Sequence, residues 1–171
     1  LTIFRPGFSK SMREEFHSLV LEELDFVQEA RRQEAFCRAA EESRKNFFSA
    51  PHVCLDLSGE EMMVSSFASG MWLWELLAAI EQGNEAGLAR AREMNIDHRK
   101  VARRLLWVNY WAREENLFFH ANPNANNIII GQDSKLYFIN FSPTGNLSRS
   151  RKQAMRQNLY YAWQRDPQNM A

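Results

Sequence analysis

The stretch from residue 117 to residue 142 constrains the fold more than any other part of the 171-residue chain. An apolar, helix-like run ends at His120, and a polar loop with one proline follows. Two apolar segments, 128–130 and 135–141, come next and are separated by a short polar turn. Apolar runs of this length on either side of a turn predict a β-hairpin. The sequence therefore predicts a helix, a polar loop and a hairpin in immediate succession.

Three asparagines stand at characteristic places in this stretch. Asn127 lies five positions after Asn122, and Asn140 lies thirteen positions after Asn127. The order is that of a kinase catalytic loop and its metal-binding hairpin. There, a loop Asp orients the substrate hydroxyl, an Asn five positions later holds a metal, and the Asp of an Asp-Phe-Gly triplet holds metal against the phosphates. Here amides occupy both Asp positions.

The flanking residues make the likeness more specific. Residues 120–127, His-Ala-Asn-Pro-Asn-Ala-Asn-Asn, resemble the His-Ala-Asp-Pro-His-Pro-Gly-Asn loop of the AarF/UbiB family of atypical, coenzyme-Q-linked kinase-like proteins. Residues 22–30 resemble that family's Glu-Leu-Asp-Phe-x-x-Glu-Ala helix, and residues 3–7 resemble the end of its Val-Lys-Val-Gln-Arg-Pro-Gly strand. The three blocks occur in the family's order and span most of the chain.

The resemblance implies an α+β, mostly helical, protein-kinase-like fold, chiefly the large lobe with a truncated small lobe. Residues 1–67 are expected to be the remnant of the small lobe and a hinge hairpin. Residues 68–171 are expected to be the helical large lobe with the catalytic-loop hairpin. The family's Ala-rich nucleotide loop and Lys-x-Gly-Gln extension have no counterpart in this sequence. Since the chain begins inside an expected strand, we expect an excised or truncated domain.

Apolar periodicity and capping residues predict the remaining elements. A helical pattern covers about 11–44, and a bend or break is expected because about 30 uninterrupted helical residues would be long. Further helices are expected at 71–80, 97–117 and 148–164, strands at 52–57 and 62–67, and a loop at 82–87. Asp97 is the expected N-cap of the central helix.

Asn122 and Asn140 stand where the resemblance implies the catalytic and metal-binding Asp. An amide has no useful basicity, so Asn122 can position a group but cannot accept a proton; it can also simply structure the loop. Magnesium favours carboxylate oxygens. Replacing one carboxylate by a neutral oxygen removes a charge pair worth a few kcal/mol at an effective dielectric of ~20. Asn127 matches the family's own Asn, so one neutral metal ligand is expected to remain.

The resemblance also assigns Thr2, Glu29 and His120. Thr2 aligns with the Lys that pairs the phosphates, and Thr cannot supply that charge. Glu29 matches the helix Glu that this Lys pairs with. Without the Lys we expect Glu29 to be solvated and replaceable, with Glu29→Gln changing stability by no more than ~0.5 kcal/mol. His120 matches a loop His whose implied task is structural, namely packing under the loop and hydrogen-bonding to backbone.

Bulk properties exclude several classes of function. The formal net charge is zero, so there is no global field to attract nucleic acid. Cys37 and Cys54 form no disulfide framework and no metal-ligand spacing, and His17, His52 and His98 share none either; both cysteines are expected to be small buried hydrophobes. The basic cluster 149–152 is expected to be a solvated helix start, or alternatively to touch an anionic membrane or a partner.

The first hypothesis is a degenerate AarF/UbiB-type domain, a pseudokinase acting as a binding or regulatory module. The resemblance implies ATP and magnesium, weakly bound here if at all, and a link to quinone or lipid metabolism. A protein partner or a membrane surface is expected, at a cytoplasmic or membrane-peripheral location. The second hypothesis is a kinase or ATPase with residual phosphotransfer that uses an upstream segment. The third, a phosphotransferase of the aminoglycoside or choline kinase type, is disfavoured by residues 22–30.

Overall fold

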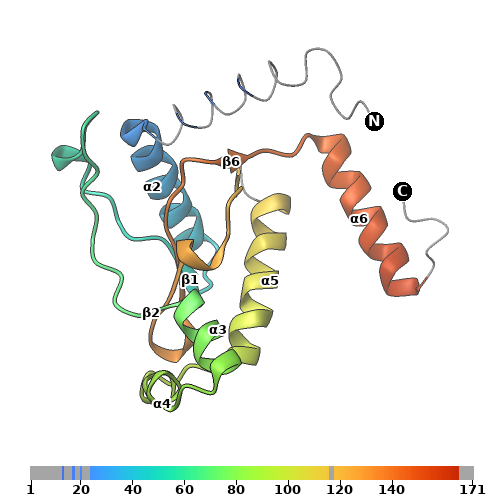
Figure 1. Cartoon of the computed structure of the whole chain (residues 1–171). Coiled ribbons are helices and arrows are strands. Elements are labelled where there is room, and N and C mark those ends of the chain that lie inside the picture. Colours follow the sequence, from blue (N-terminus) through green and yellow to red (C-terminus); the bar gives the residue numbers. More distant parts are fainter. Residues whose placement is uncertain (1–12, 14–16, 18–19, 21–23, 116–117, 166–171) are drawn as a thin grey trace, which may run out of the picture.

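The computed structural model describes residues 13, 17, 20, 24–115 and 118–165 (Figure 1). Its helices are α2 (Phe26–Glu42), α3 (Leu73–Gln82), α4 (Glu85–Glu93), α5 (His98–Glu114) and α6 (Arg149–Gln164), with 3-10 turns at Leu55–Leu57, Ala125–Asn127 and Gln132–Ser134. Its strands are β1 (Phe48–Ser49), β2 (Met71–Trp72), β3 (Phe119–His120), β4 (Ile128–Ile130), β5 (Leu136–Phe138) and β6 (Thr144–Gly145). The expected mostly helical α+β fold is confirmed.

A small four-stranded sheet in the order β1-β5-β4-β2 forms the middle of the molecule. The predicted hairpin is confirmed, since β4 and β5 pair antiparallel with Ile128 opposite Phe138. Strand β1 runs parallel to β5, and β2 runs antiparallel to β4. Helices α2 and α5 pack against this sheet, and the side chains between them form one apolar core that includes Phe36, Trp111 and Phe141 (Figure 1).

The sequence predicted a bend or a break somewhere in the long helical pattern, and the structure places one at Leu24 and Asp25, immediately before α2. The Asp25 side chain accepts a hydrogen bond from the Gln28 N–H at 2.9 Å and so caps the helix. Such a cap is worth about 1 kcal/mol. The core-facing side of α2 is buried from residue 29 to residue 40, with members Glu29, Ala30, Gln33, Phe36, Cys37 and Ala40.

Helix α5 is the central helix that the sequence predicted, but it ends at Glu114. Phe119–His120, expected to end the helix-like run, instead form strand β3, which pairs with β6. The Asp97 side chain caps α5 by accepting from the N–H groups of Arg99 and Lys100 at 2.8 and 3.2 Å. The Ser134 hydroxyl, in the turn between β4 and β5, accepts from the Asp97 N–H at 2.9 Å. The hairpin turn is thereby joined to the start of α5. The chain that leaves the other end of α5 therefore runs back along the helix to reach this turn.

The predicted hairpin over 52–67 is wrong in extent. The described residues there form one antiparallel bridge between Val53 and Ser65, and Leu55–Leu57 is a 3-10 turn rather than a strand. The physical reason is exposure. Leu57 and Phe67 lie at the surface with 65% and 91% of their area exposed, so a longer strand pair there would not be stabilised by packing.

Two helix boundaries also differ from prediction. Residues Met71–Trp72 pair with β4 before α3 begins, because a Cβ on Gly70 would lie 2.5 Å from the Ile130 carbonyl and only glycine permits that approach. The loop expected at 82–87 is confined to Gly83 and Asn84, and a helix that the sequence did not predict, α4, follows it because the Asn84 side chain caps that helix. The predicted final helix is confirmed as α6, which extends away from the body beside α5 (Figure 1).

Candidate functional site

The loop after α5 is held from below by His120. This side chain is buried, and its Nε2 lies 2.8 Å from the Ile139 carbonyl oxygen. Its Nδ1 accepts from the Asn122 N–H at 3.2 Å, which leaves the proton on Nε2 to be donated to Ile139. Burial lowers the pKa of His120, although its backbone hydrogen bonds oppose this shift. His120 is therefore a neutral imidazole that joins the loop to the end of β5.

Asn127 holds the same loop from its other end. Its side-chain amide is buried and donates to the Asn122 carbonyl at 3.0 Å, and its own carbonyl accepts from the Ile139 N–H at 3.0 Å. Asn122 directs its side-chain oxygen to the Asn124 amide at 2.8 Å. The structure thus brings Asn122 and Asn127 into direct contact and places Asn127 against the residue that precedes Asn140.

Asn140 begins the triplet that follows the hairpin, and its backbone is left-handed with φ 59°. Asn adopts this conformation more readily than most residues. Its Oδ1 is buried and has no hydrogen-bond partner among the described residues. The next residue, Phe141, is fully buried, with its ring centroid 5.0 Å from that of Phe36 and 4.9 Å from that of His120. The buried ring fixes the position of the triplet.

Glu29 corrects a prediction. The sequence led us to expect a solvated and replaceable Glu29, but this side chain is only 8% exposed. Its carboxylate accepts from the Phe141 N–H at 3.3 Å and from the Ser142 hydroxyl at 3.2 Å. The prediction was wrong because it considered only Thr2, which lies outside the described residues, as a partner. Glu29 faces the triplet from α2, and Arg32 of the same helix donates to the Ser142 carbonyl.

These residues do not fit a tightly held magnesium ion. The loop and triplet side chains at the expected metal positions, Asn127 and Asn140, offer neutral amide oxygens. Asn127 is also engaged with the loop backbone. The nearby carboxylate, Glu29, accepts hydrogen bonds from the triplet. Magnesium is usually bound through one or two carboxylates together with phosphates. The unpartnered Oδ1 of Asn140 can still accept a hydrogen bond or ligate weakly.

A cluster that the sequence did not predict lies further along α2, where Cys37 and Glu41 meet His52. Cys37 and Glu41 are four residues apart, a spacing that places them on one face of a helix. His52 shares no spacing with them, so only the fold shows that it joins them. Cys37 is buried as expected, but Cys54 is exposed, because it lies in the segment that forms no sheet.

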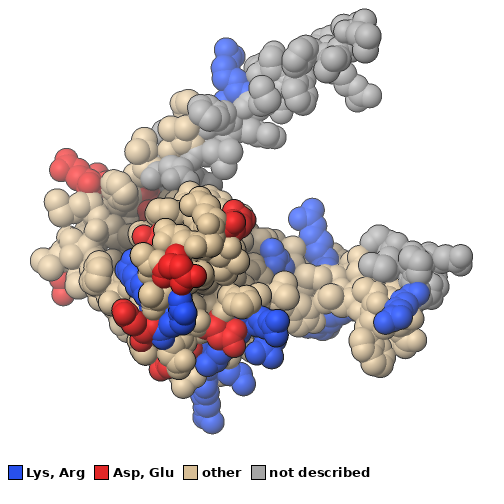
Figure 2. Space-filling model, turned by 60° about the horizontal axis from the view of Figure 1, so that its bottom comes forward, with Lys and Arg blue, Asp and Glu red and all other residues tan. Residues whose placement is uncertain are grey.

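The body of the molecule has no dominant charge on the face shown in Figure 2. Acidic and basic side chains are interspersed over it. Within the described part of the chain, every helix is too short or too polar to cross a membrane. In the cluster at 149–152, Lys152 donates to the Glu114 carbonyl at 3.0 Å, which ties the start of α6 to the end of α5.

The fold, the loop and the triplet define a kinase-like domain. The sequence model of the ABC1 atypical kinase-like domain matches residues 1–171, and the chain therefore belongs to this family, the AarF/UbiB family. The resemblance seen in the sequence is confirmed.

Two solved structures are similar. The complex of Rv3197 with erythromycin from Mycobacterium tuberculosis matches with a TM-score of 0.67 and 16% identity, covering 99% of this chain and 39% of that chain. The bifunctional kinase-methyltransferase WbdD matches with a TM-score of 0.43 and 20% identity, covering 80% of this chain and 32% of that chain. Both identities are low, so a match can support the fold alone, and only the Rv3197 match has a TM-score high enough to do so. No curated protein matches the chain.

Proposed function

We propose that this chain is a pseudokinase, a kinase-like domain that has lost phosphoryl transfer and acts as a binding or regulatory module. One observation carries the proposal: the side chains at both Asp positions are amides, and that of Asn122 is bonded within its own loop. A general base must accept a proton, and an amide at neutral pH does not. Phosphoryl transfer depends on positioning and charge stabilisation, so neutral groups at both positions remove its main contributions.

The buried residues around the loop support a binding role. Glu29, His120 and Phe141 hold the loop and the triplet in a defined arrangement that does not depend on a reaction. A loop held in this way can present its exposed polar side chains, such as Asn124 and Asn126, to a partner. We propose a protein partner or a membrane surface, with nucleotide bound weakly if at all. A link to quinone or lipid metabolism rests on the family alone.

A second candidate is an atypical kinase or ATPase with residual phosphotransfer. The buried, unpartnered Oδ1 of Asn140 favours it, because an amide oxygen in that place can still ligate a metal. The chain spans 39% of the Rv3197 chain, so a longer protein could supply further groups.

The two candidates are separated by measuring ADP formation from magnesium-ATP. We expect the chain itself, Asn140→Asp and Asn122→Asp each to match the protein-free blank, because parts that act as a unit are not recovered singly. Asn140→Gly removes the ligand while retaining the left-handed backbone. Asn95→Gly is its matched control, since Asn95 is an exposed Asn with φ 51°. Turnover that disappears in Asn140→Gly and persists in Asn95→Gly would establish the enzyme instead.

A further inference from the structure

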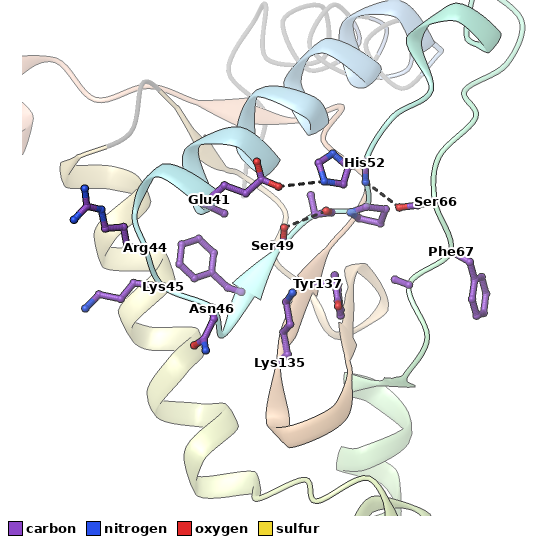
Figure 3. Close-up of a pocket in the computed structure, with 15 residues that line it drawn as sticks. Glu41, Arg44, Lys45, Asn46, Ser49, His52, Ser66, Phe67, Lys135 and Tyr137 are labelled. Atoms are coloured by element: carbon purple, nitrogen blue, oxygen red, sulfur yellow. Dashed lines mark hydrogen bonds and ion pairs between the residues drawn. The ribbon is translucent and has the colours of Figure 1, made fainter.

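The cluster on the second half of α2 lies outside the kinase-like loop. One ligand atom each from Cys37, Glu41 and His52 lies within 4.8 Å of the other two. Cys37 and Glu41 project from successive turns of α2, and His52 comes from the segment after β1. Glu41 and His52 line a pocket of about 520 Å³, and Figure 3 shows their side chains directed toward each other at its edge.

We propose that Cys37, Glu41 and His52 bind a single zinc ion, with the fourth coordination position open to this pocket. A thiolate, an imidazole and a carboxylate are the three ligand types that zinc uses in proteins. Sites with three protein ligands keep a fourth position for water or an exchangeable ligand. Glu41 and His52 line this pocket, so an ion held by them would lie at its edge.

Two of the three separations between ligand atoms are close to those of tetrahedral zinc, and the third, from Cys37 Sγ to the Glu41 carboxylate, is within 4.8 Å. His52 Nε2 lies 3.1 Å from Glu41 Oε1 and 3.7 Å from Cys37 Sγ. Bond lengths of ~2.3 Å to sulfur and ~2.1 Å to nitrogen and oxygen give tetrahedral edges of about 3.4 Å for N···O and about 3.6 Å for S···N. The two edges that involve His52 Nε2 therefore need changes of only a few tenths of an ångström in length. Because Cys37 Sγ lies 3.6 Å from Nδ1 as well, the ring must also turn for Nε2 to face the ion.

The charges also balance. A Cys37 thiolate and the Glu41 carboxylate together carry two negative charges, and a neutral His52 adds none, so a divalent ion makes the site neutral. Sulfur and imidazole ligands favour zinc over magnesium or calcium, which select oxygen. The site therefore differs in chemistry from the amide loop.

The histidine is positioned by its surroundings. The His52 N–H donates to the Ser66 hydroxyl at 3.0 Å, and the His52 carbonyl accepts from the Ser66 N–H at 2.8 Å (Figure 3 shows the first bond). The second ring nitrogen, Nδ1, lies 3.7 Å from Glu34 Oε2. A carboxylate behind a zinc-bound histidine fixes the ring and raises its basicity. At 3.7 Å the two groups are not hydrogen-bonded, so we expect Glu34 to become a positioning residue by moving closer to the ring when zinc binds.

The test is a titration of the chelator-treated chain with zinc against a chromophoric competitor. We expect one zinc per chain. Removing a ligand in Cys37→Ser or His52→Gln should weaken binding more than the ~10- to 100-fold expected for the outer group in Glu34→Gln. Cys54→Ser and His98→Gln are matched controls at an exposed cysteine and an exposed histidine, and both should bind as the parent chain does.

Cobalt(II) gives a second readout that does not depend on affinity. Cobalt bound to the parent chain should show a thiolate charge-transfer band that Cys37→Ser lacks and Cys54→Ser retains. His52→Gln is an exposed substitution, so its effect can be read even if Cys37→Ser folds poorly. Failure to bind zinc, equal weakening in the two controls, or a cobalt spectrum without the thiolate band would mean that Glu41 and His52 form an ordinary surface ion pair.

Discussion

The residues that support the loop and the triplet differ in chemistry from the residues at their two Asp positions. Beneath the 120–127 loop, Glu29, His120 and Phe141, which we call the support residues, are buried and bonded to backbone or packed between rings. At the two Asp positions of the loop and triplet, Asn122 and Asn140 carry no charge. The difference teaches that folding and catalysis constrain separate residues. Leaving a buried donor or acceptor unpaired costs about 1–3 kcal/mol, a cost that the bonded support residues avoid and that the unpartnered Oδ1 of Asn140 does not.

The largest expected effect is at Phe141. Replacing this fully buried ring by Ala leaves a cavity beside Phe36 and His120, and we expect the free energy of unfolding to fall by about 3–5 kcal/mol. Urea denaturation measures it. Phe67→Ala is the matched control, because Phe67 is exposed and its loss should cost no more than about 0.5 kcal/mol. Equal losses in both variants would show that Phe141 does not anchor the triplet.

Glu29→Gln should have the next largest effect. The substitution turns one acceptor toward the Phe141 N–H or the Ser142 hydroxyl into a donor, so we expect a loss of about 1–3 kcal/mol. Glu42→Gln, an exposed substitution on the same helix, is the control for charge alone. A loss in Glu29→Gln no larger than that of the control would restore our original interpretation of a replaceable glutamate.

We expect His120 to make a smaller contribution to stability, one that depends on pH. Because burial lowers its pKa in the folded chain, the unfolded chain binds the proton more tightly, and stability must fall as pH drops below the unfolded value of about 6.5. Melting temperatures between pH 7.5 and pH 5 measure this slope. The slope should be shallower in His120→Gln and unchanged in His98→Gln. Identical slopes in all three proteins would mean that His120 is not held neutral.

The sequence predicted the elements that local signals specify. Asp97 caps α5 and Ser148 caps α6, and the short turn between the apolar runs at 128–130 and 136–138 brings them together as an antiparallel pair. It failed where the outcome depends on distant neighbours. The segment 52–57 has strand-like composition, but the fold offers it no apolar surface to pack against. Gly87 looks like a helix breaker, yet it allows α4 to approach Ala79.

The same limit applies to the site. The spacing of Asn122, Asn127 and Asn140 could be read directly from the sequence, because the loop is one continuous segment. Glu29 accepts hydrogen bonds from Phe141 and Ser142, which lie 112 and 113 positions away, and no local sequence pattern predicts these contacts. His52 likewise meets Cys37 only because β1 pairs with β5 and returns the chain across α2.

The magnesium dependence of nucleotide binding tests the central claim most directly. A ligand at ~100 times its dissociation constant stabilises a protein by about 2.7 kcal/mol, which a thermal-shift titration detects readily. With neutral amides at the positions of both carboxylates, we predict that ATP gives a small shift or none, and that adding magnesium leaves it unchanged. A shift with ATP that grows strongly on adding magnesium would contradict the account, because it would show that the loop and triplet still hold the ion.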